Sequence, residues 1–176
     1  VLCGASMGGM VAMEAARQSP GHLRGLALLG TTARPETPEM RRVREDAIAL
    51  FEAGRVEEVL RANVAFAFHP DRRGDVVLIQ SYIDLVLRAG TAQLVRQNRA
   101  VIARPDARAH LPGLRCPLLV LHGEADALTP PDCAEEIVAL VPGARRSLIP
   151  GAGHMLTLEQ PRAVNHALLD WLSTLP

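Results

Sequence analysis

Apolar residues along the chain form two kinds of pattern, short continuous runs and longer runs with helical spacing. Residues 26–29 and 118–121 are uninterrupted apolar runs, and residues 147–150 form a weaker one. Runs of this length are typical of strands buried on both faces of a parallel sheet. Helical spacing follows in residues 9–18, 130–140 and 161–172. Strands that alternate with helices predict an α/β doubly wound fold.

The helix predicted over 130–140 has its own start signals. Pro130 and Pro131 suit a first turn, and Thr129 is the expected N-cap. Pro161 opens the last predicted helix in the same way.

The middle of the chain departs from this alternation. Four amphipathic helices are predicted, over 40–51, 56–64, 76–87 and 92–102, without a buried strand between them. An all-helical insertion between two sheet strands has the placement of a cap or lid. We therefore expect a partial core of residues 1–34 and 115–176, with a helical cap over 35–114. Apolar residues of this cap line an acyl pocket or pack in its own core, and the candidates are Phe66, Phe68, Leu78 and Tyr82.

Composition narrows the class of protein. A chain of 176 residues with 48% hydrophobic and 22% charged residues is typical of a globular, soluble domain. Nineteen basic and nineteen acidic side chains cancel, so no basic surface for nucleic acid or membrane lipid is expected, and small molecules are the expected partners. No apolar run is long enough to span a bilayer and no leader pattern opens the chain, which favours the cytoplasm. Three irregularly spaced cysteines predict neither a disulfide framework nor a metal site, and no cofactor is expected.

A candidate nucleophile lies near the start of the chain. Gly4-Ala5-Ser6-Met7-Gly8 stands between a short apolar segment and a helical run. G-x-S-x-G in a strand-turn-helix context is the pattern of a nucleophile elbow, whose flanking residues must lack side chains where strand and helix approach. The motif alone also occurs by chance in unrelated chains, so the prediction depends on the strand before it and the helix after it.

A serine needs a base, and the base needs a group that orients it. Asp126 ends the sequence His122-Gly123-Glu124-Ala125-Asp126, directly after the best buried run, and His154 follows Gly151-Ala152-Gly153 after the third. Parallel strands present such loops at their carboxyl edge. The order Ser, Asp, His is the one that α/β hydrolases use. Glu124 and Asp132 are alternatives to Asp126 as the acid that orients the histidine. His122 is expected to shape the turn that carries Asp126. The remaining histidines are expected to be solvated: His22, His69, His110 and His166.

The segments GASMGG, LLVLHGEADALTPP and IPGAGHM together resemble the α/β-hydrolase superfamily, in the branch of small bacterial esterases, enol-lactonases and carbon–carbon bond hydrolases. The resemblance implies that Ser6 attacks a carbonyl carbon, His154 transfers the proton and Asp126 holds the imidazole. The backbone N–H of Met7 would be one oxyanion-hole donor. Serine at position 6, where related dehalogenases carry aspartate, implies acyl chemistry.

The resemblance implies a serine hydrolase that acts on a carboxylic ester or related acyl substrate through an acyl-enzyme, with a lactonase or carbon–carbon bond hydrolase as alternatives. An elbow at residue 6 departs from the family, which places four strands before it and takes its second oxyanion donor from an early loop. A catalytically incompetent fragment or scaffold is therefore a second hypothesis. We also expect the sheet edge at residues 1–3 to be unpaired and to promote self-association.

Overall fold

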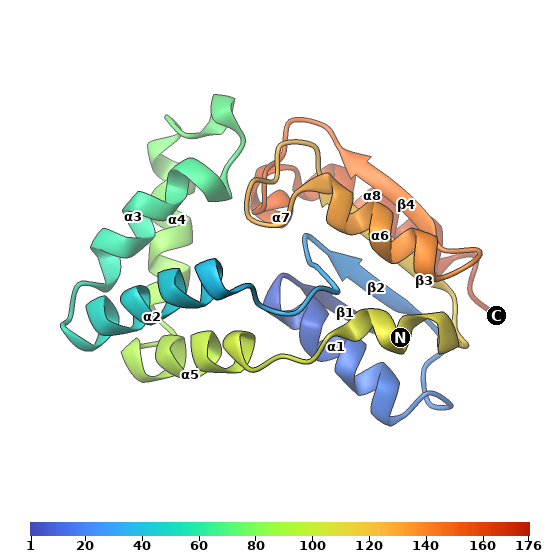
Figure 1. Ribbon diagram of the computed structural model, residues 1–176. Helices are drawn as coiled ribbons and strands as arrows, with labels where there is room; N and C mark the ends of the chain where they lie inside the picture. Colours follow the sequence, from blue (N-terminus) through green and yellow to red (C-terminus); the bar gives the residue numbers. More distant parts are fainter.

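The computed structural model describes all 176 residues and contains a four-stranded parallel sheet with helices on both faces (Figure 1). Leu2 lies opposite Leu26 in the first strand pair, and Leu26 lies opposite Leu118 in the second. The α/β fold expected from the sequence is confirmed. The strands lie side by side in chain order: β1 (Leu2–Ala5), β2 (Leu26–Leu29), β3 (Leu118–Gly123) and β4 (Arg145–Ile149).

The central strands β2 and β3 are buried along their whole length because helices cover both faces of the sheet. Successive side chains of a strand point to opposite faces, so each strand contributes to two cores. Leu28 and Val120 pack with α1 (Met7–Gln18) and α6 (Pro131–Leu140) on one face. Leu29 and Leu121 pack on the other face with α8 (Pro161–Leu172).

Residues 38–102, which we call the helical insert, form a helical body between β2 and β3 (Figure 1), whereas Ala107 and Leu111 of the expected cap pack in the core of the sheet. Phe68 and Tyr82 meet edge to face in its core, with ring centroids 5.3 Å apart, and Leu78 packs against the same cluster. These three residues thus pack in the core of the insert, whereas Phe66 is exposed. The insert contains α2 (Pro38–Glu52), α3 (Val56–Ala67), α4 (Val76–Leu87) and α5 (Thr91–Ile102).

Several helix starts follow from local hydrogen bonds. The Thr37 side chain accepts the N–H of Met40 at the start of α2, and Asp75 accepts that of Leu78 at the start of α4. The expected N-cap role of Thr129 is wrong, because α6 begins at Pro131 after Pro130 and makes no side-chain cap. A short helix after β4, α7 (Leu156–Glu159), was not predicted.

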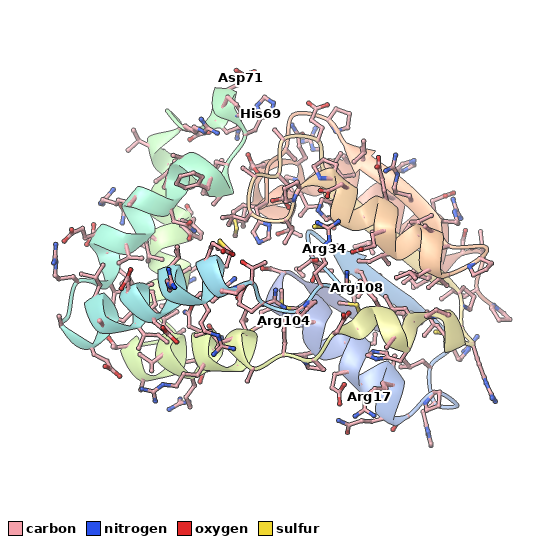
Figure 2. All side chains as sticks on the ribbon, viewed as in Figure 1. Arg17, Arg34, His69, Asp71, Arg104 and Arg108 are labelled. Carbon is pink, nitrogen blue, oxygen red and sulfur yellow. The ribbon has the colours of Figure 1, made fainter.

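A buried ion cluster joins the two crossings between the sheet and the helical insert. Glu36, whose side chain is 3% exposed, pairs with Arg44 and, at 2.9 Å, with Nη1 of Arg104. Arg104 also donates through Nε to the carbonyl oxygen of Arg34 at 2.8 Å, and Figure 2 shows both arginines at this junction. Burial alone would raise the pKa of Glu36, but the hydrogen bonds from Arg104 and Arg44 bring it below its usual value.

None of the helices is both long enough and apolar enough to cross a membrane.

Candidate active site

Ser6 occupies the sharp turn between β1 and α1. Its backbone has φ 50° and ψ −118°, and Ser6 is the one non-glycine residue with positive φ. The Ser6 N–H donates to the carbonyl oxygen of Leu29 at 2.8 Å, and the Thr31 hydroxyl donates to the Ser6 carbonyl oxygen at 2.8 Å. Strand β2 and the residues after it therefore hold the strained turn in place.

The glycines around Ser6 differ in the space that each has. A Cβ on Gly4 would collide with the carbonyl of Gly8, and a Cβ on Gly9 would lie 2.6 Å from the Thr31 side chain. A Cβ on Gly8 would meet nothing within 4 Å. The expectation that both motif glycines must lack a side chain is thus wrong for Gly8, and Gly9 takes that role.

The structure brings Ser6, His154 and Asp126 into one hydrogen-bonded chain. His154 Nε2 lies 2.8 Å from Ser6 Oγ, and His154 Nδ1 lies 2.9 Å from Asp126 Oδ2. The side chain of Asp126 is fully buried and that of His154 is 8% exposed. Each residue follows the carboxyl end of a different parallel strand, which explains how positions up to 148 residues apart meet.

Asp126 is held by further donors. Its Oδ1 accepts the N–H groups of Leu128 and Thr129, both at 2.9 Å, and its Oδ2 also accepts the Thr129 hydroxyl at 2.9 Å. Burial alone would raise the pKa of Asp126, but the hydrogen bond from His154, together with those from Thr129, holds that pKa below its usual value. The carboxylate is therefore ionised at neutral pH.

His122 shapes the turn that carries Asp126, as expected. Its ring is fully buried, and burial lowers the pKa of His122, so the imidazole is neutral. Nε2 of His122 lies 2.6 Å from the carbonyl oxygen of Thr129, which requires that this nitrogen carries the proton and donates.

The other two carboxylates considered for the Asp126 position lie elsewhere. Glu124 accepts the N–H of Gly151 at 2.7 Å, and Asp132 pairs with Arg34 at 2.9 Å. Neither is bonded to His154.

Two of the four remaining histidines differ from expectation. His22 and His166 are exposed as predicted. The prediction is wrong for His69, whose side chain is 18% exposed, and for His110, whose Nε2 is buried without a partner.

Met7, the expected oxyanion-hole donor, is the first residue of α1. The first N–H groups of a helix have no carbonyl partner within the helix, so this position leaves the Met7 N–H available.

Sequence reasoning missed the roles that Thr31, Thr129 and Glu159 have in the site. Thr31 supports the Ser6 turn and Thr129 supports Asp126. The buried Glu159 accepts the N–H of Gly153, next to His154. No motif pointed to Thr31, and Thr129 was expected to cap a helix rather than to bind Asp126. Glu159 carried only the weak signal of an acidic residue five positions after His154.

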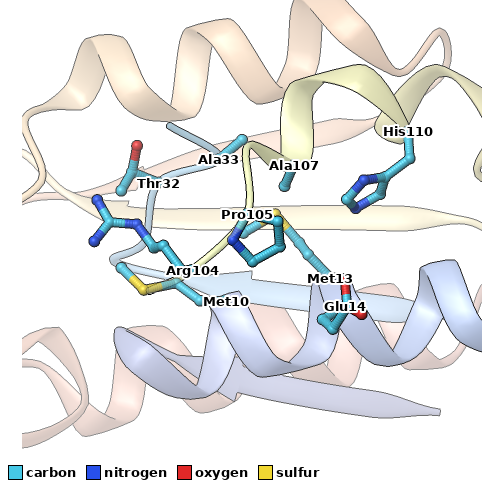
Figure 3. A pocket seen from close by; sticks show the side chains of 9 residues that line it. All are labelled: Met10, Met13, Glu14, Thr32, Ala33, Arg104, Pro105, Ala107 and His110. Carbon is cyan, nitrogen blue, oxygen red and sulfur yellow. The ribbon is translucent and has the colours of Figure 1, made fainter. Parts of the chain in front are cut away.

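Two pockets on the sheet side of the molecule are not lined by Ser6. One, of about 10 Å³, lies between α1 and the segment that follows the helical insert, lined among others by Met10, Thr32 and His110 (Figure 3). A second, of about 140 Å³, is lined by Met13, Leu111 and neighbouring residues. No group of three or more His, Cys, Asp or Glu side chains lies close enough together to hold a metal ion.

Sequence comparison places this chain in a family. Residues 1–161 match the family described as Serine aminopeptidase, S33, so the chain belongs to this family of α/β hydrolases. The chain is 34% identical to part of the polyketide synthase ThaQ of Burkholderia thailandensis over 97% of its own length. It is 30% identical to the pimeloyl-[acyl-carrier protein] methyl ester esterase of Aromatoleum aromaticum, over 92% of this chain and 69% of the relative.

Structure comparison agrees. The fold matches a thermophilic esterase from Thermogutta terrifontis with a TM-score of 0.91 and 31% identity, over 97% of this chain. The chain spans 63% of that esterase and 8% of ThaQ.

Proposed function

We propose that the protein is a serine hydrolase that cleaves a carboxylic ester through a Ser6–His154–Asp126 triad and an acyl-enzyme intermediate. The observation that carries the proposal is the continuous chain of hydrogen bonds, 2.8 Å from Ser6 Oγ to His154 Nε2 and 2.9 Å from His154 Nδ1 to Asp126 Oδ2. Both lengths lie within the range that proton transfer to a general base requires.

The reaction follows from these positions. Ser6 Oγ attacks the ester carbonyl carbon while its proton passes to His154 Nε2, and the ionised Asp126 stabilises the imidazolium. The C–O bond then breaks, and the departing alkoxide takes the proton from His154. Water attacks the acyl-enzyme with His154 as base, which releases the carboxylic acid and restores Ser6. The Met7 N–H would donate to the oxyanion in both tetrahedral intermediates.

An ester is the favoured substrate because two of the relatives compared are named as esterases. A lactone or a carbon–carbon bond next to a ketone would use the same three side chains. We further infer that the helical insert acts as a cap over Ser6 and that the protein works in the cytoplasm.

The test is labelling with a fluorophosphonate, followed by a panel of p-nitrophenyl esters, lactones, thioesters and aminoacyl anilides. We expect one label on Ser6 and ester turnover that falls by about 10⁴-fold or more in Ser6→Ala. Asp126→Asn should lose about 10⁴-fold, because its amide no longer stabilises the imidazolium. A folded chain that neither takes up the label nor cleaves any of these compounds would instead support the second hypothesis, a catalytically incompetent fragment or scaffold.

A further inference from the structure

A second buried carboxylate, outside the chain of Ser6, His154 and Asp126, lies beneath the loop that carries His154. Glu159 is 5% exposed and pairs with no arginine or lysine. Its two oxygens accept two backbone N–H groups instead, Oε2 that of Gly153 at 2.8 Å and Oε1 that of His69 at 2.7 Å. A buried carboxylate that accepts one N–H on each oxygen fixes the position of both donors.

The two donors belong to different parts of the molecule. Gly153 directly precedes His154, whereas His69 belongs to the helical insert, 90 residues from Glu159 in the sequence. Figure 2 shows His69 and Asp71 at the end of the insert. Glu159 thus joins the loop that carries His154 to the helical insert through one side chain.

The insert also contacts the residue after His154. The N–H of Met155 donates to the carbonyl oxygen of Ala67 at 3.1 Å, and the Met155 side chain packs against the core of the insert. A Cβ on Gly153 would lie 2.7 Å from the backbone of Phe68 and His69, so the two segments touch directly. Both sequence neighbours of His154 are therefore fixed against residues 67–69.

This arrangement matters because the loop has little rigidity of its own. Residues 151–153 are Gly-Ala-Gly, and Gly151 has a φ of +64°. Glycine leaves the backbone many conformations, whereas the imidazole must keep both of its hydrogen bonds at once. Contacts with other segments must therefore fix the conformation of this loop.

We propose that Glu159 is a positioning residue, which makes the alignment of His154 depend on the seating of the helical insert. The proposal rests on the proposed function of His154 as general base. With the insert seated, Glu159 and Ala67 fix the N–H groups on either side of His154. With the insert displaced, Gly153 and Met155 lose these anchors together, and His154 leaves the line between Asp126 and Ser6.

Glu159→Gln is the direct test, because the amide keeps the shape but offers one acceptor oxygen for two N–H donors. We expect kcat to fall by about 10-fold to 100-fold, with KM within about twofold, since a small misplacement of a catalytic group has this effect. The matched control is Glu124→Gln, because Glu124 accepts the N–H of Gly151 in the same loop but makes no hydrogen bond to the backbone of the insert, where its one contact is the His69 imidazole at 3.8 Å. Its kcat should stay within about twofold of wild type.

His69→Pro tests the same contact from the insert and covers the case in which Glu159→Gln fails to fold. His69 has φ −54° and Phe68 before it is extended, so proline fits this backbone. The substitution removes the N–H donor together with the imidazole, whose Nδ1 accepts the N–H of Asp71. His69→Ala keeps the N–H and controls for the imidazole. We expect His69→Pro to lower kcat as Glu159→Gln does, and His69→Ala to leave it unchanged.

Amide hydrogen exchange supplies a readout that needs no activity. The amides of His69 and Gly153 should exchange faster together in Glu159→Gln. Glu124→Gln keeps one acceptor oxygen for the single N–H of Gly151, so it should leave the exchange of His69 and Gly153 unchanged. Unchanged kcat in both Glu159→Gln and His69→Pro would overturn the proposal, as would faster exchange at Gly153 with His69 still protected. If the wild type hydrolyses nothing, the proposed function fails. The exchange experiment still tests the coupling in that case, because faster exchange of both amides in Glu159→Gln supports it and faster exchange of only one contradicts it.

Discussion

At the scale of single residues, the shared acceptor at Asp126 has a consequence for pH. Oδ2 accepts both His154 Nδ1–H and the Thr129 hydroxyl, and both donors favour the ionised form of the carboxyl group. A carboxyl group whose pKa is lower in the folded state than in the unfolded state, about 3.9, stabilises the fold above that pH. This stabilisation is lost as the pH falls through the folded-state pKa.

Thr129→Val removes one of these donors while it keeps the shape of the side chain. We expect the free energy of unfolding at pH 7 to fall by about 1–2 kcal/mol, because a buried hydrogen bond is lost. The pKa of Asp126 in the folded state should rise, so acid unfolding should begin at a higher pH than in wild type. Urea unfolding followed from pH 3 to pH 7 measures both effects. Thr129→Ser, which keeps the hydroxyl, should behave like wild type; an unchanged acid transition in the valine variant would contradict the assignment.

The glycines of the Ser6 turn give a second prediction at this scale. Gly8→Ala should be tolerated and should stabilise α1 by up to about 1 kcal/mol, because the site is open and alanine favours a helix. Gly4→Ala and Gly9→Ala place a methyl group against Gly8 and Thr31, and should destabilise the protein by more than about 2 kcal/mol. Thermal unfolding of the three variants measures this order. A Gly8 variant as unstable as the Gly4 variant would show that the turn is tighter than described.

At the scale of elements, the sequence predicts the bounds of those helices and strands that have a clear local pattern of apolar residues. Helix α8 has the predicted bounds of 161–172, and β2 coincides with the run 26–29, because each has a continuous apolar face or run. Strand β4 begins two residues before the predicted run, since Arg145 and Arg146 pair with β3 while their side chains stay exposed. Helix α7 has four residues, too few for a periodic pattern.

The same limit applies to the site. Ser6, Asp126 and His154 carry recognisable local sequence around them, so the sequence was enough to nominate them. Thr31 and Glu159 act through bonds to positions 25 and 90 residues away. Such contacts have no local signal, because chain folding alone brings the partners together.

The ion cluster at Glu36 leads to a prediction about how the helical insert is attached. Glu36→Ala would leave the nearly buried Arg104 without its carboxylate, which should lower the free energy of unfolding by about 2–4 kcal/mol. Glu57→Ala, which breaks the exposed pair with Arg61, is the matched control and should change it by less than about 1 kcal/mol. Chemical unfolding of both variants provides the measurement, and equal losses would contradict a special role for Glu36.

At the scale of the whole molecule, the outer edge of β1 sets the expected behaviour in solution. β1 pairs with β2 alone, and Val1 and Cys3 at this strand and Val11 on α1 are exposed. Unpaired strand edges with apolar neighbours favour pairing between chains. We predict that the 176-residue chain associates at micromolar concentration. Sedimentation velocity over a range of concentrations tests this, and a stable monomer throughout would show that the edge is protected.

The backbone conformation of Ser6 imposes a trade-off between thermal stability and catalytic activity. A serine at φ 50° and ψ −118° lies outside the regions that side chains favour, at about 1–3 kcal/mol above a relaxed backbone. Ser6→Gly should therefore raise the melting temperature while it abolishes turnover. Selection for heat resistance alone would remove this serine first. Directed evolution of this protein should accordingly screen for activity and stability together, and seek its stabilising changes at sites such as Gly8.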